Sequence, residues 1–193
     1  MNPLSQSCKR IAGRLLLLWG VAAAATSEAG PIAFDTFWEF GFDGVAFATG
    51  CSPADPAGSF CIASSGTPTS FLDAPPWTFA VPVATTLTVT DTFKAGDQFQ
   101  VFDFGASLGV TSPPIGNADC GDDPVPCLAD PNISKAVFPL GPGNHSITIS
   151  SLKDASGSGY LQVTAIPEPA SLLAFTLGGL AALVAARSRR RKG

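Results

Sequence analysis

The sequence is poor in positive charge outside its two ends. Its 193 residues include 11 lysines and arginines against 15 aspartates and glutamates. Eight of these cations fall in residues 1–29 and 168–193, so residues 30–167 keep three lysines against thirteen carboxylates, a formal charge of 3 − 13 = −10. This balance argues against a nucleic-acid partner, because phosphate binding requires a basic surface. Cations and neutral sugars are more compatible partners for a region of this negative charge.

Histidine is almost absent, and so are the local motifs of common enzymes. His145 is the single histidine, and no nucleophile elbow or comparable motif accompanies it. We therefore expect no catalytic residues and a protein that is not an enzyme. A secreted hydrolase remains the weakest alternative. It rests on fold analogy alone, with Asp103 and His145 as the residues to test.

Residues 30–166 lack helical periodicity and contain short segments rich in Val, Ile, Thr and Phe, separated by turn residues. This pattern predicts an all-β fold over residues 30–165, a single β-sandwich of jelly-roll or carbohydrate-module type. A hairpin link is expected at residues 94–97. The predicted strands are residues 78–83, 85–93, 98–104, 135–140, 146–152 and 160–166, with one or two more between residues 32 and 49.

Residues 1–29 have the pattern of a secretory signal peptide. Basic residues precede an apolar run at residues 15–25, and residues 27–29 offer a small-x-small cleavage site. The apolar run is too short for a comfortable transmembrane helix. The mature chain is therefore expected to begin at Gly30 and to be exported.

The cysteines of the exported region lack the spacing of a zinc site. Cys51, Cys61, Cys120 and Cys127 include no tight Cys-x-x-Cys pair and have no histidine nearby. An even number of cysteines in an exported chain favours disulfides, with three possible connectivities. The pairs Cys51–Cys61 and Cys120–Cys127 are preferred, because each brackets a stretch rich in Pro, Gly and Asp.

The last 28 residues combine three features in a fixed order. The motif Pro167, Glu168, Pro169 precedes an apolar run at residues 170–186. That run predicts a helix of about 25 Å, near the short limit for crossing a hydrocarbon core of about 30 Å. Cations at residues 187–193 would hold the C-terminus on the cytoplasmic side. They are Arg187, Arg189, Arg190, Arg191 and Lys192.

This arrangement resembles the PEP-CTERM sorting signal of Gram-negative bacteria, and the resemblance covers residues 166–193. It implies that an exosortase, a membrane transpeptidase, cuts the exported protein at the Pro-Glu-Pro motif. It also implies a precursor anchored in the inner membrane by the C-terminal helix, and a product at the cell surface or outside the cell. Whether the product is anchored or released stays open.

Three aspartates and one tryptophan are the candidate ligand-binding residues of the exported region. Asp91, Asp97 and Asp103 are expected near the ends of paired strands, where oxygen ligands from loops suit Ca²⁺. The alternative is that these aspartates form turns. The sequence also lacks the regular spacing of acidic residues found in an EF-hand loop. Trp77 is the candidate for stacking on a sugar ring, with core packing as the alternative.

Together these features predict an exported, exosortase-processed surface or extracellular-matrix protein. Its expected role is structural or adhesive and linked to exopolysaccharide or biofilm. A calcium-dependent carbohydrate-binding module is the alternative, and Ca²⁺ is the one cofactor under consideration.

Overall fold

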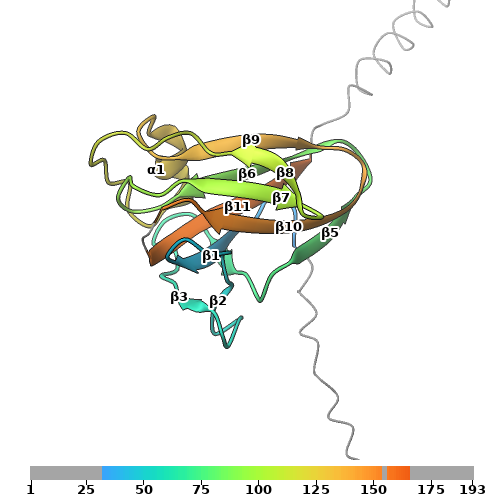
Figure 1. Cartoon of the computed structure of the whole chain (residues 1–193), viewed down its shortest axis with the longest axis horizontal. Helices are drawn as coiled ribbons and strands as arrows, with labels where there is room; N and C mark the ends of the chain where they lie inside the picture. Colours follow the sequence, from blue (N-terminus) through green and yellow to red (C-terminus); the bar gives the residue numbers. More distant parts are fainter. Residues whose placement is uncertain (1–31, 154–155, 166–193) are drawn as a thin grey trace, which may run out of the picture.

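A computed structural model describes residues 32–153 and 156–165 of the chain (Figure 1). These residues form eleven strands and one short helix, so the expected all-β fold is confirmed. The signal peptide (residues 1–29), the Pro-Glu-Pro motif (167–169), the apolar run (170–186) and the basic tail lie outside the described residues. Within the described residues, no helix has the length and apolar character needed to cross a membrane.

Nine of the described strands form two sheets, ordered β4-β1-β11-β6-β9 and β5-β10-β7-β8. The short strands β2 (Cys51–Ser52) and β3 (Ser59–Phe60) pair with each other in parallel. The bounds of the other strands are β1 Phe37–Asp43, β4 Thr69–Phe71, β5 Trp77–Val81, β6 Thr85–Asp91, β7 Phe99–Asp103, β8 Ala106–Val110, β9 Lys135–Leu140, β10 Gly143–Ser151 and β11 Ser156–Ala165.

The antiparallel pairs are nested along the chain. β1 pairs with β11, β5 with β10, β6 with β9, and β7 with β8. The chain therefore follows the path of one long hairpin whose tip is the β7–β8 turn. This hairpin is folded over so that its strands are divided between the two sheets. Figure 1 shows β7 and β8 side by side at this tip.

Aromatic side chains from both sheets meet in one core. Phe40 and Phe42 of β1 are 0% and 1% exposed, and both contact Phe99 of β7, with ring centroids 5.3 and 5.2 Å apart. Trp77 of β5 is also fully buried, with its ring 5.9 Å from that of Phe40. Burial of these large apolar surfaces holds the two sheets together.

The link expected at residues 94–97 is not a hairpin. β6 and β7 lie in different sheets, so this segment crosses from one layer to the other. The error arose because nearness in sequence favours pairing between consecutive strands, whereas burial of both apolar faces places these two in opposite layers.

Five elements were not expected from the sequence, namely β2, β3, β4, β8 and the helix α1 (Pro124–Ala129). With six residues, α1 is too short to show a helical period. Its start has a local cause, because Asp123 accepts a hydrogen bond from the Val125 N–H and Pro124 occupies the first turn.

Both expected disulfides are confirmed, Cys51–Cys61 and Cys120–Cys127. The loops that contain them are joined by two further pairs of hydrogen-bonded side chains. Ser65 donates to Asp122 at 2.8 Å, and Thr67 donates to Asp123 at 2.8 Å. The two disulfide loops therefore support each other.

We expect Gly159→Ala to lower the free energy of unfolding by about 1–3 kcal/mol through overpacking. Gly159 lies opposite Phe40 on the neighbouring strand, and an added Cβ would come within 2.6 Å of Phe40 Cζ and 2.9 Å of the Thr90 carbonyl oxygen. Urea unfolding measures the change. Gly141→Ala is the control, because a Cβ there meets no atom within 4 Å. Equal losses in the two variants would contradict this account of the core.

Candidate functional site

Side chains that β1 and β11 turn away from the core form a second buried cluster. Glu39 is 0% exposed, although it points to the opposite face of β1 from Phe40. Tyr160 pairs with Glu39 in the β1–β11 register and is 1% exposed. Cys51 Sγ lies 3.3 Å from the Glu39 carbonyl oxygen. A disulfide loop, rather than the second sheet, therefore covers this face.

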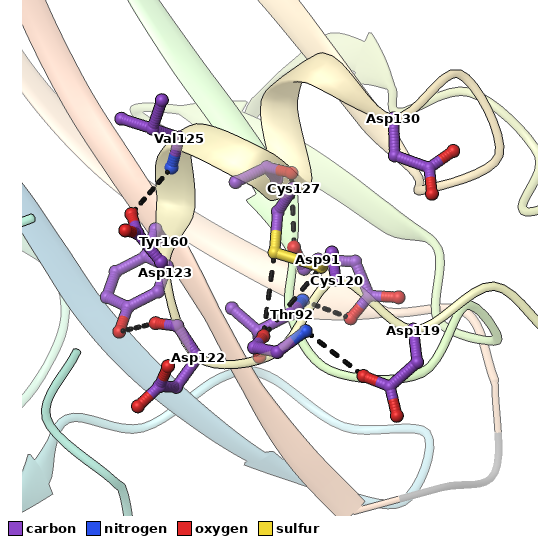
Figure 2. Close-up of a disulfide and its surroundings, with 12 residues drawn as sticks. Asp91, Thr92, Asp119, Cys120, Asp122, Asp123, Val125, Cys127, Asp130 and Tyr160 are labelled. Carbon is purple, nitrogen blue, oxygen red and sulfur yellow. Dashed lines mark hydrogen bonds between the residues drawn. A yellow bond between two sulfur atoms is a disulfide. The ribbon is translucent and has the colours of Figure 1, made fainter. Parts of the chain in front are cut away.

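The Glu39 carboxyl is incompletely hydrogen-bonded. The Tyr160 hydroxyl donates to the Asp122 carbonyl at 2.9 Å (Figure 2) and lies 3.5 Å from Glu39 Oε2. Among the described residues, Glu39 Oε1 has no hydrogen-bond partner. Burial raises the pKa of Glu39 to about 7, and the charge of Asp122 acts in the same direction. The carboxyl is therefore partly protonated near neutral pH.

Glu39 does not belong to a metal centre. In the described part of the chain, Glu39, Cys51 and Cys61 are the one set of three potential ligands close enough to share an ion. Both sulfur atoms are joined in a disulfide, and metal binding requires the thiolate. The cluster is instead a buried acid beneath a cross-linked loop.

The structure brings two of the three predicted aspartates together where β6 ends. Asp91 accepts hydrogen bonds from the N–H groups of Thr92 at 2.8 Å and Asp97 at 3.3 Å. Burial raises the pKa of Asp91 to about 7, and the charge of Asp97 adds to this effect. Burial also raises the pKa of Asp97, while Lys153 lowers it. Oδ1 of Asp97 is buried and has no partner among the described residues.

A cavity of about 290 Å³ adjoins this pair, and Asp97 and Asp119 both line it. Figure 2 shows Asp119 beside the Cys120–Cys127 disulfide, and Thr92 lines the same cavity as Asp119. Asp119 accepts a hydrogen bond from the Gly121 N–H at 3.0 Å. Two carboxylates therefore line the cavity. Its other lining residues are Thr92, Phe93, Lys94, Ser156, Gly157 and Ser158.

Asp103 does not join this acidic pair, so the predicted three-aspartate calcium site is wrong. Asp103 lies at the far end of β7, about 13 Å along the strand from its start. Its Oδ2 is 2.8 Å from Nδ1 of His145, and its Oδ1 accepts from the Ser146 N–H at 2.9 Å.

His145 is held from both sides of its ring. Nδ1 faces Asp103, and Nε2 lies 2.9 Å from the Gly141 carbonyl oxygen. The ring also packs on Phe79, with centroids 5.4 Å apart. Because both nitrogens face oxygen atoms, neither is free to accept a proton from a nucleophile. The pair joins β10 to β7, and the hydrolase alternative has no free general base at these residues.

The prediction that Trp77 stacks on sugar is wrong. Its side chain is 0% exposed, and the indole N–H donates to the Asp73 carbonyl at 2.9 Å. Among the described aromatic residues, those more than 60% exposed are Phe47, Phe60 and Phe104, at 62%, 83% and 68%. None of these three phenylalanines was a ligand-binding candidate from the sequence. For Phe104, the Gly that follows it at the end of a predicted strand was an available turn signal.

Comparisons with known proteins bear mainly on the C-terminus. The family model for the PEP-CTERM protein-sorting motif matches residues 165–191, which confirms the motif recognised in the sequence. No curated protein matches the chain. A solved pre-peptidase C-terminal domain of collagenase from Bacillus anthracis is 15% identical and covers 46% of this chain and 73% of its own, with a TM-score of 0.28. Similarity at that level supports no conclusion about fold or function.

We expect Glu39 to make stability depend on pH. Its pKa rises from 4.5 to about 7 on folding, so the folded state keeps a proton that the unfolded state releases. The contribution of Glu39 to the free energy of unfolding should be fully present below about pH 4.5 and should fall by roughly 3 kcal/mol as the pH rises through 7, in addition to any contribution of the same sign from Asp91. Urea unfolding between pH 5 and pH 8 tests this.

Glu39→Gln cannot ionise and should lose this part of the pH dependence. Asp35→Asn removes a carboxylate at an exposed position and serves as the control. A Glu39→Gln protein that keeps the wild-type pH profile would show that this carboxyl does not carry the effect.

Proposed function

We propose that this PEP-CTERM protein is a non-enzymatic structural or adhesive component of the cell surface or extracellular matrix, linked to exopolysaccharide or biofilm. The sorting motif at residues 165–191 carries the proposal, because it indicates export and delivery to an exosortase. The precursor is held at the inner membrane by its C-terminal segment. Cleavage at Pro167, Glu168 and Pro169 then transfers the domain to the surface or releases it.

The architecture of the domain supports an extracellular role. Nested pairing of eight strands in two sheets is the connectivity of a jelly roll, a fold that presents broad sheet faces for binding. Both loop disulfides suit an oxidising compartment. The charge of −10 over residues 30–167 keeps the domain soluble and favours uncharged polysaccharide over acidic polymers.

Replacing Pro167, Glu168 and Pro169 by alanine should block processing, because the extended, proline-bracketed segment is lost. In cells that make an exosortase, the variant should remain full-length in the membrane fraction, as measured by fractionation and intact mass. A double substitution of Pro113 and Pro114 by alanine, in a loop of the domain, is the control. Normal processing of the triple variant would remove the support for exosortase cleavage.

A calcium-dependent carbohydrate-binding module is the second candidate, favoured by one observation. Oδ1 of Asp97 is buried without a partner among the described residues, and it lies beside Asp91 and the cavity that Asp119 also lines. Carboxylate oxygens that converge from loops suit Ca²⁺. Here the two carboxylates are those of Asp91 and Asp97.

If this candidate is correct, 2 mM CaCl₂ should raise Tm by several degrees, because ligand binding stabilises the folded state alone. Asp97→Asn should abolish the rise, and Asp35→Asn, which removes an equal charge elsewhere, should keep it. Differential scanning fluorimetry with CaCl₂ or EGTA makes the comparison. A wild-type Tm that does not respond to calcium rejects this candidate.

A further inference from the structure

The outer face of the four-stranded sheet carries phenylalanine rings among neutral polar side chains. Alternation along β7 and β10 turns Val101, Ile147 and Ile149 into the core and the residues between them outward. The register places Thr148 beside Phe102, and Phe102 beside Ser107. Along this row across the three strands, an aromatic ring therefore lies between two hydroxyl-bearing residues.

Three phenylalanines, Phe47, Phe102 and Phe104, form what we call the phenylalanine face. Phe102 lies half-buried at its centre. Phe47 bridges to Ser150 of β10, and its ring centroid is 6.0 Å from that of Phe102. Phe104 follows two residues after Phe102, and its N–H donates to the Ser146 carbonyl at 2.9 Å. With Phe47 and Phe104 mostly exposed, the face presents aromatic surface to solvent.

Phe104 adopts a backbone conformation that its side chain disfavours. Phe104 and Gly105 form the two-residue turn between the paired residues Asp103 and Ala106, with φ of +47° and +77°. Two positive φ values are the pattern of a type I′ turn, whose first position favours Asn, Asp or Gly. A bulky residue there is strained, because its side chain crowds the backbone at positive φ. Because Phe104 is 68% exposed, core packing does not offset this strain.

The chemistry of the face suits an uncharged ligand. None of the described side chains that β5, β7, β8 and β10 turn outward is charged. A cavity of about 380 Å³ adjoins Phe104 and is lined by Phe79 and His145 at its inner side and by the polar residues Thr78, Asn144 and Ser146. The side chains of these three polar residues make no hydrogen bond to any described residue. Free hydroxyl and amide groups beside exposed rings match a ligand with apolar C–H faces and many hydroxyls.

We propose that the phenylalanine face binds a neutral polysaccharide chain. The rings of Phe47, Phe102 and Phe104 stack on sugar faces, and polar groups beside them bond the hydroxyls. The absence of charge on this face, in a domain of formal charge −10, selects an uncharged polymer over an acidic one. The inference deepens the proposed matrix role and rests on it for the presence of polysaccharide.

Affinity electrophoresis of the full-length protein in detergent tests the proposal. The gels contain extracellular polysaccharide of the producing cells, divided by anion exchange into neutral and acidic fractions. We expect the neutral fraction to retard the protein. Phe47→Ala and Phe104→Ala should each weaken binding about fivefold, as expected for the loss of one aromatic contact, and the double variant should weaken it more than tenfold. Phe104→Trp should keep binding.

Phe60→Ala is the matched control, because Phe60 is 83% exposed but lies on β3, outside this face. Binding should be unchanged. Phe104→Asn separates binding from folding. Because Asn tolerates positive φ, the free energy of unfolding of the Phe104→Asn variant should equal or exceed that of the wild type. Its affinity for the polysaccharide should fall as far as that of Phe104→Ala. A purely structural role for Phe104 predicts lower stability and unchanged binding.

The proposal is overturned by wild-type binding in the double variant, by an equal loss in Phe60→Ala, or by retardation in the acidic fraction alone. It is also overturned if neither fraction retards the wild type. Fractionation of the culture, which measures whether the wild-type protein reaches the matrix, distinguishes a failure of polysaccharide binding from a failure of the proposed matrix role. A wild-type protein that reaches the matrix without binding polysaccharide keeps its matrix role, through protein partners. If the wild-type protein is absent from the matrix, the proposed matrix role is itself rejected.

Discussion

The contact of Phe99 with Phe40 and Phe42 is the constraint on which the rest of the domain depends, because it joins the inner faces of the two sheets. Strand alternation then decides what lies outside. Residues between these aromatics on β1 must point to the outer face of the five-stranded sheet, and residues between Phe99 and Val101 on β7 must point to the outer face of the other. One core therefore determines both outer surfaces.

The outer surface of one sheet is covered by loops, and that of the other sheet is exposed. Loops cross-linked by disulfides cover Glu39 and Tyr160, so the five-stranded sheet gains a second buried layer. Within the described residues, no loop covers the four-stranded sheet around Phe102, and its neighbours Phe47 and Phe104 are exposed. In a chain whose loops are long and acidic, the exposed face is formed by regular strands. Rigid strands hold side chains at fixed spacing, which suits recognition of a repeating polymer.

Local features of the sequence predicted most of the strands, both disulfides and the sorting motif, because each depends on residues close together in the chain. The ligand sites depended on long-range arrangement. Asp97 meets Asp91 while Asp103 meets His145, since β6 and β7 belong to different sheets, and no local pattern encodes that choice. Trp77 likewise is buried only because β5 faces β1. The exposure of Phe104 follows from a two-residue turn that composition alone did not locate.

Glu39 and Phe104 both occupy locally unfavourable states, and only one of them points to a ligand. Burial without full hydrogen bonding destabilises ionised Glu39, yet a loop covers it, and no partner from solvent can reach it without opening that loop. Phe104 also adopts an unfavourable conformation, but its ring is open to solvent beside free polar groups. A residue in an unfavourable state supports an argument for ligand binding when a ligand can reach it from solvent. By this criterion the phenylalanine face, rather than the buried acid, is where the domain meets its partner.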